Sequence, residues 1–76
     1  MTPNFILKMT VCSRTEYKVV LNAPHDTLKH ANERFDRIMN GQENYGQALY
    51  DPHKYGVFLT IKSARTGKVV RRMQIN

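Results

Sequence analysis

The sequence has no tryptophan and only one cysteine, Cys12. Because a disulfide needs two cysteines, no intramolecular disulfide can stabilise the fold. Its apolar runs are short and fall far below the roughly 20 residues that span a bilayer. The N-terminal segment MTPNFILKMTV lacks the charged region, the longer apolar run and the cleavage site of a signal peptide. These absences favour a soluble protein of the reducing cytoplasm that does not enter the membrane.

The sequence also lacks the residue patterns that catalytic, metal and cofactor sites require. Its three histidines and single thiol do not have the spacing of zinc ligands, and its four glycines are too far apart to form a phosphate-binding loop. We therefore expect a non-enzymatic protein without metal or cofactor. A third interpretation, after the two binding hypotheses given below, is a small RNA-cleaving enzyme in which His25 or His53 acts as general acid or base.

Acidic residues are scarce. Six Asp and Glu stand against twelve Lys and Arg, which gives a net charge of +6 at pH 7. No carboxylate side chain follows Asp51, so the C-terminal part of the chain is entirely basic. A domain with this charge attracts nucleic acids and acidic protein surfaces alike, so the charge does not select between them.

Alternating apolar and polar side chains predict four strands. Over residues 4–12 the odd positions are apolar, and after a polar break the odd positions are apolar again over residues 17–21, which predicts a hairpin. We expect the second strand to stop before Pro24, which has no N–H to donate to a neighbouring strand. A second hairpin is predicted near the C-terminus, with strands over residues 55–63 and 68–75.

One amphipathic helix is predicted over residues 27–40. Its apolar residues recur every three or four positions, with Asp26 or Thr27 as the N-cap and Gly41 as a left-handed stop. The apolar stripe consists of Leu28, Ala31, Phe35, Ile38 and Met39.

The C-terminal hairpin has a predicted register. A turn with Gly67 in the left-handed conformation would place Lys68 opposite Ala64 and Arg71 opposite Ile61. Arg71 then falls in the apolar row, so a bulge or a long side chain reaching past the core has to accommodate it. The even positions form a basic face, on which Phe58, Thr60 and Lys62 lie opposite Gln74, Arg72 and Val70.

Together these elements predict one compact α+β domain over residues 1–76. Two β-hairpins form a four-stranded antiparallel sheet, and one α-helix packs on one face of it, in the order ββαββ. The pattern does not determine the order of the strands within the sheet. Because a chain this short has a thin core, we expect either very regular packing or a partner chain, and a homodimer is one such partner.

The segment between the helix and the second hairpin carries a tyrosine at every fifth position, at Tyr45, Tyr50 and Tyr55. A period of five matches neither a helix nor a strand, and an irregular connection of this length is uncommon unless it is functional or mobile. One interpretation is a lid over the end of the sheet. The other is a binding loop whose rings stack on nucleic-acid bases or contact a protein partner.

Our first hypothesis is a small basic binding module that engages nucleic acid or a nucleoprotein complex. Its cationic C-terminal hairpin would hold phosphates, and its tyrosine segment would supply stacking. The predicted binding residues are Lys54, Lys62, Arg65, Lys68, Arg71, Arg72, Tyr45, Tyr50 and Tyr55. The second hypothesis is an inhibitor or adaptor that docks the same basic surface on an acidic protein, because small motif-free chains are typical of accessory proteins of phages and mobile elements.

Overall fold

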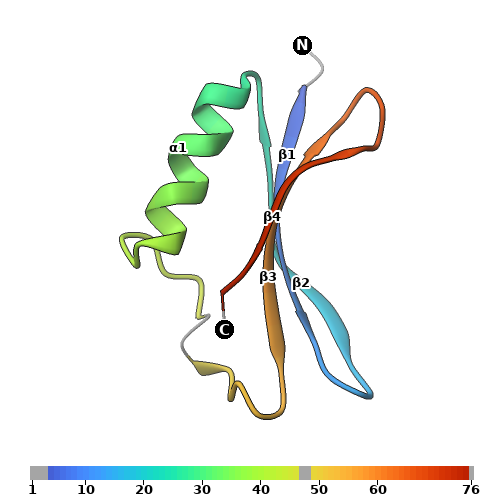
Figure 1. Ribbon diagram of the computed structural model, residues 1–76, viewed down its shortest axis with the longest axis vertical. Helices are drawn as coiled ribbons and strands as arrows, with labels where there is room; N and C mark the ends of the chain where they lie inside the picture. Colours follow the sequence, from blue (N-terminus) through green and yellow to red (C-terminus); the bar gives the residue numbers. More distant parts are fainter. Residues whose placement is uncertain (1–3, 47–48, 76) are drawn as a thin grey trace.

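Four strands and one helix follow one another in the predicted order ββαββ (Figure 1). The computed structural model describes residues 4–46 and 49–75. The elements are β1 (Phe5–Cys12), β2 (Tyr17–His25), α1 (Leu28–Met39), β3 (Gly56–Ser63) and β4 (Val69–Gln74). The strands form one antiparallel sheet in the order β2-β1-β3-β4, so the first strands of the two hairpins pair at its centre. The predicted α+β class is therefore confirmed.

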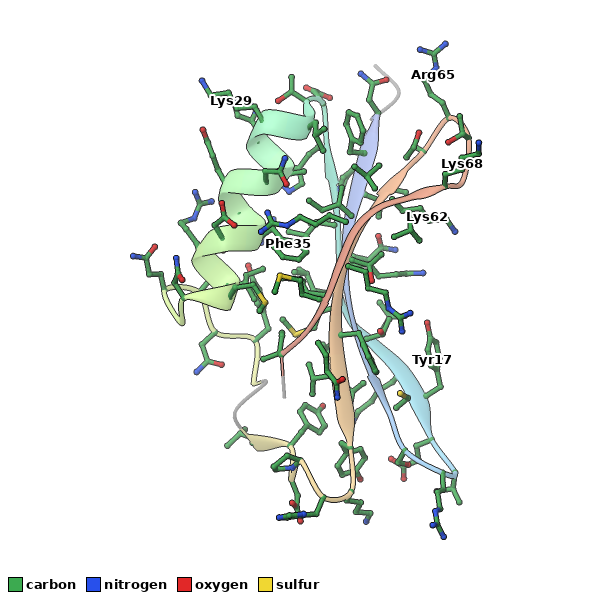
Figure 2. All side chains as sticks on the ribbon, in the orientation of Figure 1. Tyr17, Lys29, Phe35, Lys62, Arg65 and Lys68 are labelled. Atoms are coloured by element: carbon green, nitrogen blue, oxygen red, sulfur yellow. The ribbon has the colours of Figure 1, made fainter. Side chains whose placement is uncertain are left out.

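Helix α1 forms where its apolar stripe predicts. Thr27 is the N-cap, and its hydroxyl accepts a hydrogen bond from the backbone N–H of His30 at 3.2 Å. After Asn40, Gly41 adopts a φ of +78°, the left-handed conformation expected at the end of a helix. Phe35 points from the helix to the sheet and is completely buried (Figure 2). No helix of the described chain has the length and apolar character needed to cross a membrane.

The core is a single layer between α1 and the sheet. In both central strands the odd-numbered side chains point towards the helix, as the alternation predicts. Burying one side chain of this size contributes about 1.5–3 kcal/mol to the free energy of unfolding. The core residues of the two central strands are at most 1% exposed and are Leu7, Met9, Val11, Val57, Leu59 and Ile61.

Strand β2 is longer than predicted. It continues through Pro24, which lies opposite Ile6, and ends at His25. Proline is tolerated at this position because β2 is an edge strand and needs hydrogen-bond partners on one side only.

A β-bulge in β2 changes the direction of its first side chains. Leu21 lies opposite Met9, but Val19 lies opposite the next residue of β1, so Val20 has no partner in the pairing. Because one extra residue exchanges the two faces of a strand, Tyr17 and Val19 point away from the helix. The prediction that they share the core row with Leu21 is therefore wrong, and Tyr17 is 66% exposed.

The register of β3 and β4 is largely as predicted. Ile61 lies opposite Arg71, and the pairs on the C-terminal side of Arg71 follow the predicted order. Between Arg71 and the turn the pairing shifts by one residue, so Lys62 lies opposite Val69 and not opposite Val70. A bulge next to the turn accounts for this correction.

The turn of this hairpin is one residue longer than predicted. Gly67 has the expected left-handed conformation, with a φ of +74°. The closing pair, however, is Ser63 with Lys68, because the Ser63 N–H donates to the Lys68 carbonyl at 2.9 Å. Lys68 is therefore not opposite Ala64.

Arg71 reaches from β4 across to the helix. The centre of its guanidinium lies 4.0 Å from the centroid of the Phe35 ring. The same group donates to Asn32 Oδ1 at 3.1 Å and pairs with Asp36 Oδ1 at 3.0 Å. Since α1 packs mainly on β1, β2 and β3, this side chain covers the core beside β4.

We expect Arg71→Ala to lower the free energy of unfolding by about 1–2 kcal/mol, because it removes the contact with Phe35 and a partly exposed ion pair. Arg65→Ala, a matched substitution at an exposed turn residue, should change the same quantity by less than about 0.5 kcal/mol. Urea unfolding followed by circular dichroism measures both values. Equal effects of the two substitutions would show that Arg71 does not anchor the helix to β4.

Candidate functional site

Within the described chain, no element covers the face of the sheet opposite α1, the open face (Figure 1). Both hairpin turns bend away from the helix, which makes this face concave. A groove of about 560 Å3 lies on it and is lined by side chains from all four strands. Its floor consists of the β1 and β3 residues that alternate with the core residues, namely Ile6, Lys8, Thr10, Cys12, Phe58, Thr60 and Lys62.

Three cations line the groove, and none of the six acidic residues of the chain does. The cations are Lys8, Lys62 and Arg72. None of the ion pairs found in residues 4–46 and 49–75 involves them. The carboxylates in those ion pairs, Asp36 and Glu43, belong to the helix and the turn that follows it. This separation of charge leaves the open face positive.

Phe58 is an aromatic residue in the lining of the groove. It is half-buried and lies in the sheet between Thr10 of β1 and Gln74 of β4. The centre of the Arg72 guanidinium lies 4.6 Å from its ring centroid. Gly56 leaves space for this ring, because a Cβ at position 56 would lie 3.0 Å from Phe58 Cε2. A guanidinium in contact with an aromatic ring offers planar surfaces on which a further ring can stack.

Tyr17 is a second aromatic side chain on the same face (Figure 2). It lies opposite Cys12, which in turn lies opposite Gly56 of β3. The two residues beside Tyr17 in this row of the sheet are therefore small. In the described part of the chain, no aromatic ring or cation packs on the ring of Tyr17. Its ring is therefore accessible from the groove.

The predicted basic residues do not form one surface. Lys62 and Arg72 line the groove, and Lys68 extends the same side of the sheet towards the hairpin turn, where Arg65 is exposed (Figure 2). Arg71 is different, because it points to the helix and contacts Asp36 there. Adjacent arginines on β4 thus belong to opposite faces of the sheet.

The tyrosine segment does not line the groove. Tyr45, Tyr50 and Tyr55 are half-buried and pack against the core. The rings of Tyr50 and Tyr55 meet edge to face, with centroids 5.3 Å apart and an interplanar angle of 72°. The ammonium groups of Lys18 and Lys54 lie 5.3 Å and 5.4 Å from the centroids of the Tyr50 and Tyr55 rings. This packing supports the lid interpretation, and base stacking by these rings stays a prediction.

Glu43 and Tyr45 attach the start of this segment to the helix. The Glu43 carboxylate lies 3.3 Å from Arg34 Nε and 2.9 Å from Arg37 Nε. The Tyr45 hydroxyl donates to Glu43 Oε1 at 2.8 Å and accepts a hydrogen bond from Arg34. The hydrogen bond from Tyr45, followed by the hydrogen bond from Arg37 and the charge of Arg34, lowers the pKa of the Glu43 carboxyl.

The two histidines considered for catalysis lie at opposite ends of the sheet. His25 ends β2 opposite Phe5, whereas His53 precedes β3 near Cys12, the other end of β1. The eight residues of β1 separate these ends by roughly 24 Å. Burial lowers the pKa of His25, and the charge of Arg34 lowers it further. In the same described ranges, no three His, Cys, Asp or Glu side chains gather as metal ligands would.

Comparisons with protein-family models, with curated proteins and with solved structures found no match for this chain. The candidate site is therefore defined by the geometry of the open face. Its features are a concave groove, three cations without an acidic neighbour in the lining, and two aromatic side chains.

The sequence predictions for binding do not include Lys8, Tyr17 or Phe58. The alternation places Lys8 and Phe58 on the face opposite the core, and this signal is sufficient to find them. Tyr17 reaches the groove only because of the bulge at Val20, which the alternation does not reveal.

Glu43→Gln should lower the free energy of unfolding at pH 7 by roughly 1 kcal/mol, because the neutral amide loses the charge interactions with Arg34 and Arg37. The folded-state pKa of Glu43 lies below its ordinary value of 4.5. Its stabilising effect is therefore present above about pH 4.5 and is lost as the pH falls through the folded-state pKa. Urea unfolding at neutral and acid pH should show the difference between the two proteins shrinking towards acid. A difference that stays constant would contradict this role.

Proposed function

We propose that this protein is a non-enzymatic module that binds nucleic acid, or a complex containing it, through the open face of its sheet. The observation that carries the proposal is the segregation of charge. Lys8, Lys62 and Arg72 line a groove that has no acidic side chain in its lining. Cations placed together in this way repel one another, and a polyphosphate supplies the missing negative charge.

The β3–β4 turn extends this basic surface. Arg65 and Lys68 are exposed on either side of the left-handed Gly67. A cationic hairpin of this kind can follow a phosphate backbone beyond the groove itself. The proposed interface thus keeps the cationic hairpin of the sequence-based hypothesis and adds Lys8. It omits Arg71, Lys54 and the three tyrosines of the tyrosine segment.

A different feature favours the second hypothesis, an inhibitor or adaptor that docks on an acidic protein. The edge strand β4 exposes Val69, Val70 and Met73 by 57%, 46% and 45%. Protein interfaces combine apolar contacts of this kind with a charged rim. An edge strand can also pair with a second copy of the chain, which would form the expected homodimer.

Affinity for a polynucleotide should fall steeply with salt. If roughly three to five of these cations contact phosphates, the binding constant should fall on the order of 20- to 500-fold between about 50 mM and about 200 mM salt. Fluorescence anisotropy with labelled single-stranded and double-stranded DNA and RNA measures this dependence. Lys62→Ala and Arg72→Ala should each reduce the slope of log K against log salt by about 1.

Matched substitutions on the helix side are the controls. Lys29→Ala and Arg71→Ala remove one positive charge each from the other side of the sheet and should leave the slope unchanged (Figure 2). Equal losses from both faces would show that net charge, and not the open face, attracts the ligand. If no polynucleotide binds at the lower salt concentration, the proposal is refuted and an acidic protein becomes the better candidate partner.

A further inference from the structure

We infer that the open face binds a single-stranded polynucleotide, with unpaired bases stacked on Phe58 and Tyr17 and phosphates held by the three cations of the groove. The inference rests on the proposed function. It goes further because it names the strandedness of the ligand and the two residues that contact its bases.

The two aromatic side chains belong to the groove and not to the core. Phe58 and Tyr17 both line the groove, and the buried core lies on the other side of the sheet. The tyrosines of the lid are engaged elsewhere, since Tyr50 and Tyr55 contact each other. Phe58 and Tyr17 are therefore the rings that a ligand in the groove would meet.

The register of the sheet divides the open face into a cationic half and an aromatic half. Counted from the β3–β4 turn, the rows are Pro24–Ile6–Lys62–Val69, then Asn22–Lys8–Thr60–Arg72, then Val19–Thr10–Phe58–Gln74, and finally Tyr17–Cys12–Gly56. Successive rows on one face lie about 7 Å apart. A phosphate backbone that crosses the strands over the first two rows would therefore place its bases over the last two.

The lining also leaves room for planar bases. In the last row, Cys12 and Gly56 separate Tyr17 from the far side of the groove, and neither has a bulky side chain. In the neighbouring row, the ring of Phe58 is in contact with the Arg72 guanidinium. A base can stack on this pair, since both aromatic rings and guanidinium planes serve as stacking surfaces for unpaired bases.

A duplex does not fit this arrangement. In double-stranded nucleic acid the faces of the bases are stacked inside the helix, and only their edges are accessible in the grooves. Stacking on Phe58 and Tyr17 requires bases whose faces are free. A duplex would therefore contact the cations and leave both aromatic side chains without a stacked base.

The test compares four labelled probes at low salt by fluorescence anisotropy. They are a DNA strand of about 12 nucleotides, an RNA strand of matched sequence, the same DNA backbone with abasic sites, and the DNA duplex. The abasic strand carries all the phosphates but no base to stack. We expect the intact strands to bind roughly 10-fold or more tightly than the abasic strand and the duplex. The ratio of RNA to DNA affinity identifies which single strand is the preferred ligand.

Substitutions assign the effect to the two rings. Phe58→Leu and Tyr17→Leu keep an apolar side chain but remove the aromatic face, so each should weaken binding of the intact strand roughly 5- to 150-fold. Binding of the abasic strand should not change. Tyr50→Leu is the matched control in the lid and should change neither affinity. Circular dichroism checks that each variant is folded, and Tyr17, which is 66% exposed, can be replaced without disturbing the core.

The outcomes separate this inference from the proposed function. Equal affinity for intact and abasic strands, or no effect of Phe58→Leu and Tyr17→Leu, would overturn the inference while phosphate-directed binding remained. A loss caused by Tyr50→Leu alone would overturn it in favour of the tyrosine segment. Failure of the wild-type protein to bind any of the four probes would overturn both.

Discussion

A single helix can cover only one face of a four-stranded sheet, and the rest of this structure depends on that limit. With 12 residues, α1 is about 18 Å long, which is enough to cover the central strands but not the whole sheet. Arg71 compensates at β4 by reaching over the ring of Phe35 to Asp36. Arg71, although it lies in an apolar row, therefore links the sheet to the helix. The open face of the sheet is left to solvent or to a ligand.

The same limit explains the tyrosine segment. The chain that follows the helix packs against the core through the half-buried rings of Tyr45, Tyr50 and Tyr55. Tyrosine suits this position because its ring is apolar while its hydroxyl can reach a polar partner, as Tyr45 does with Glu43. The three tyrosines thus pack against the core although their spacing of five residues fits neither a helix nor a strand.

The packing also determines how the charged side chains are distributed over the two faces of the sheet. On the helix side, Asp36 and Glu43 pair with Arg34, Arg37 and Arg71, so much of the positive charge there is balanced. The groove on the open face has cations and no carboxylate in its lining. A chain with the same composition but with its carboxylates in the groove would have the same net charge and a much weaker attraction for phosphate there. Position, more than the total of +6, therefore makes the open face a candidate interface.

The periodicity of the sequence by itself determined the type and order of the elements, because burial on one side of a helix or strand repeats within that element. The N-cap preference of Asp26 or Thr27 located the start of the helix, and Thr27 is the cap in the structure. The pairing of Ile61 with Arg71 was also predicted, although the turn from which it was predicted is one residue longer in the structure. The alternation of side chains along each strand also shows that Lys62 and Arg72 point away from the core. Only the tertiary structure decided the strand order β2-β1-β3-β4, the bulge that turns Tyr17 into the groove, and the partners of Arg71. The physical reason is that each of these depends on contacts between segments far apart in the chain, whereas periodicity reports only which side of its own element a residue occupies.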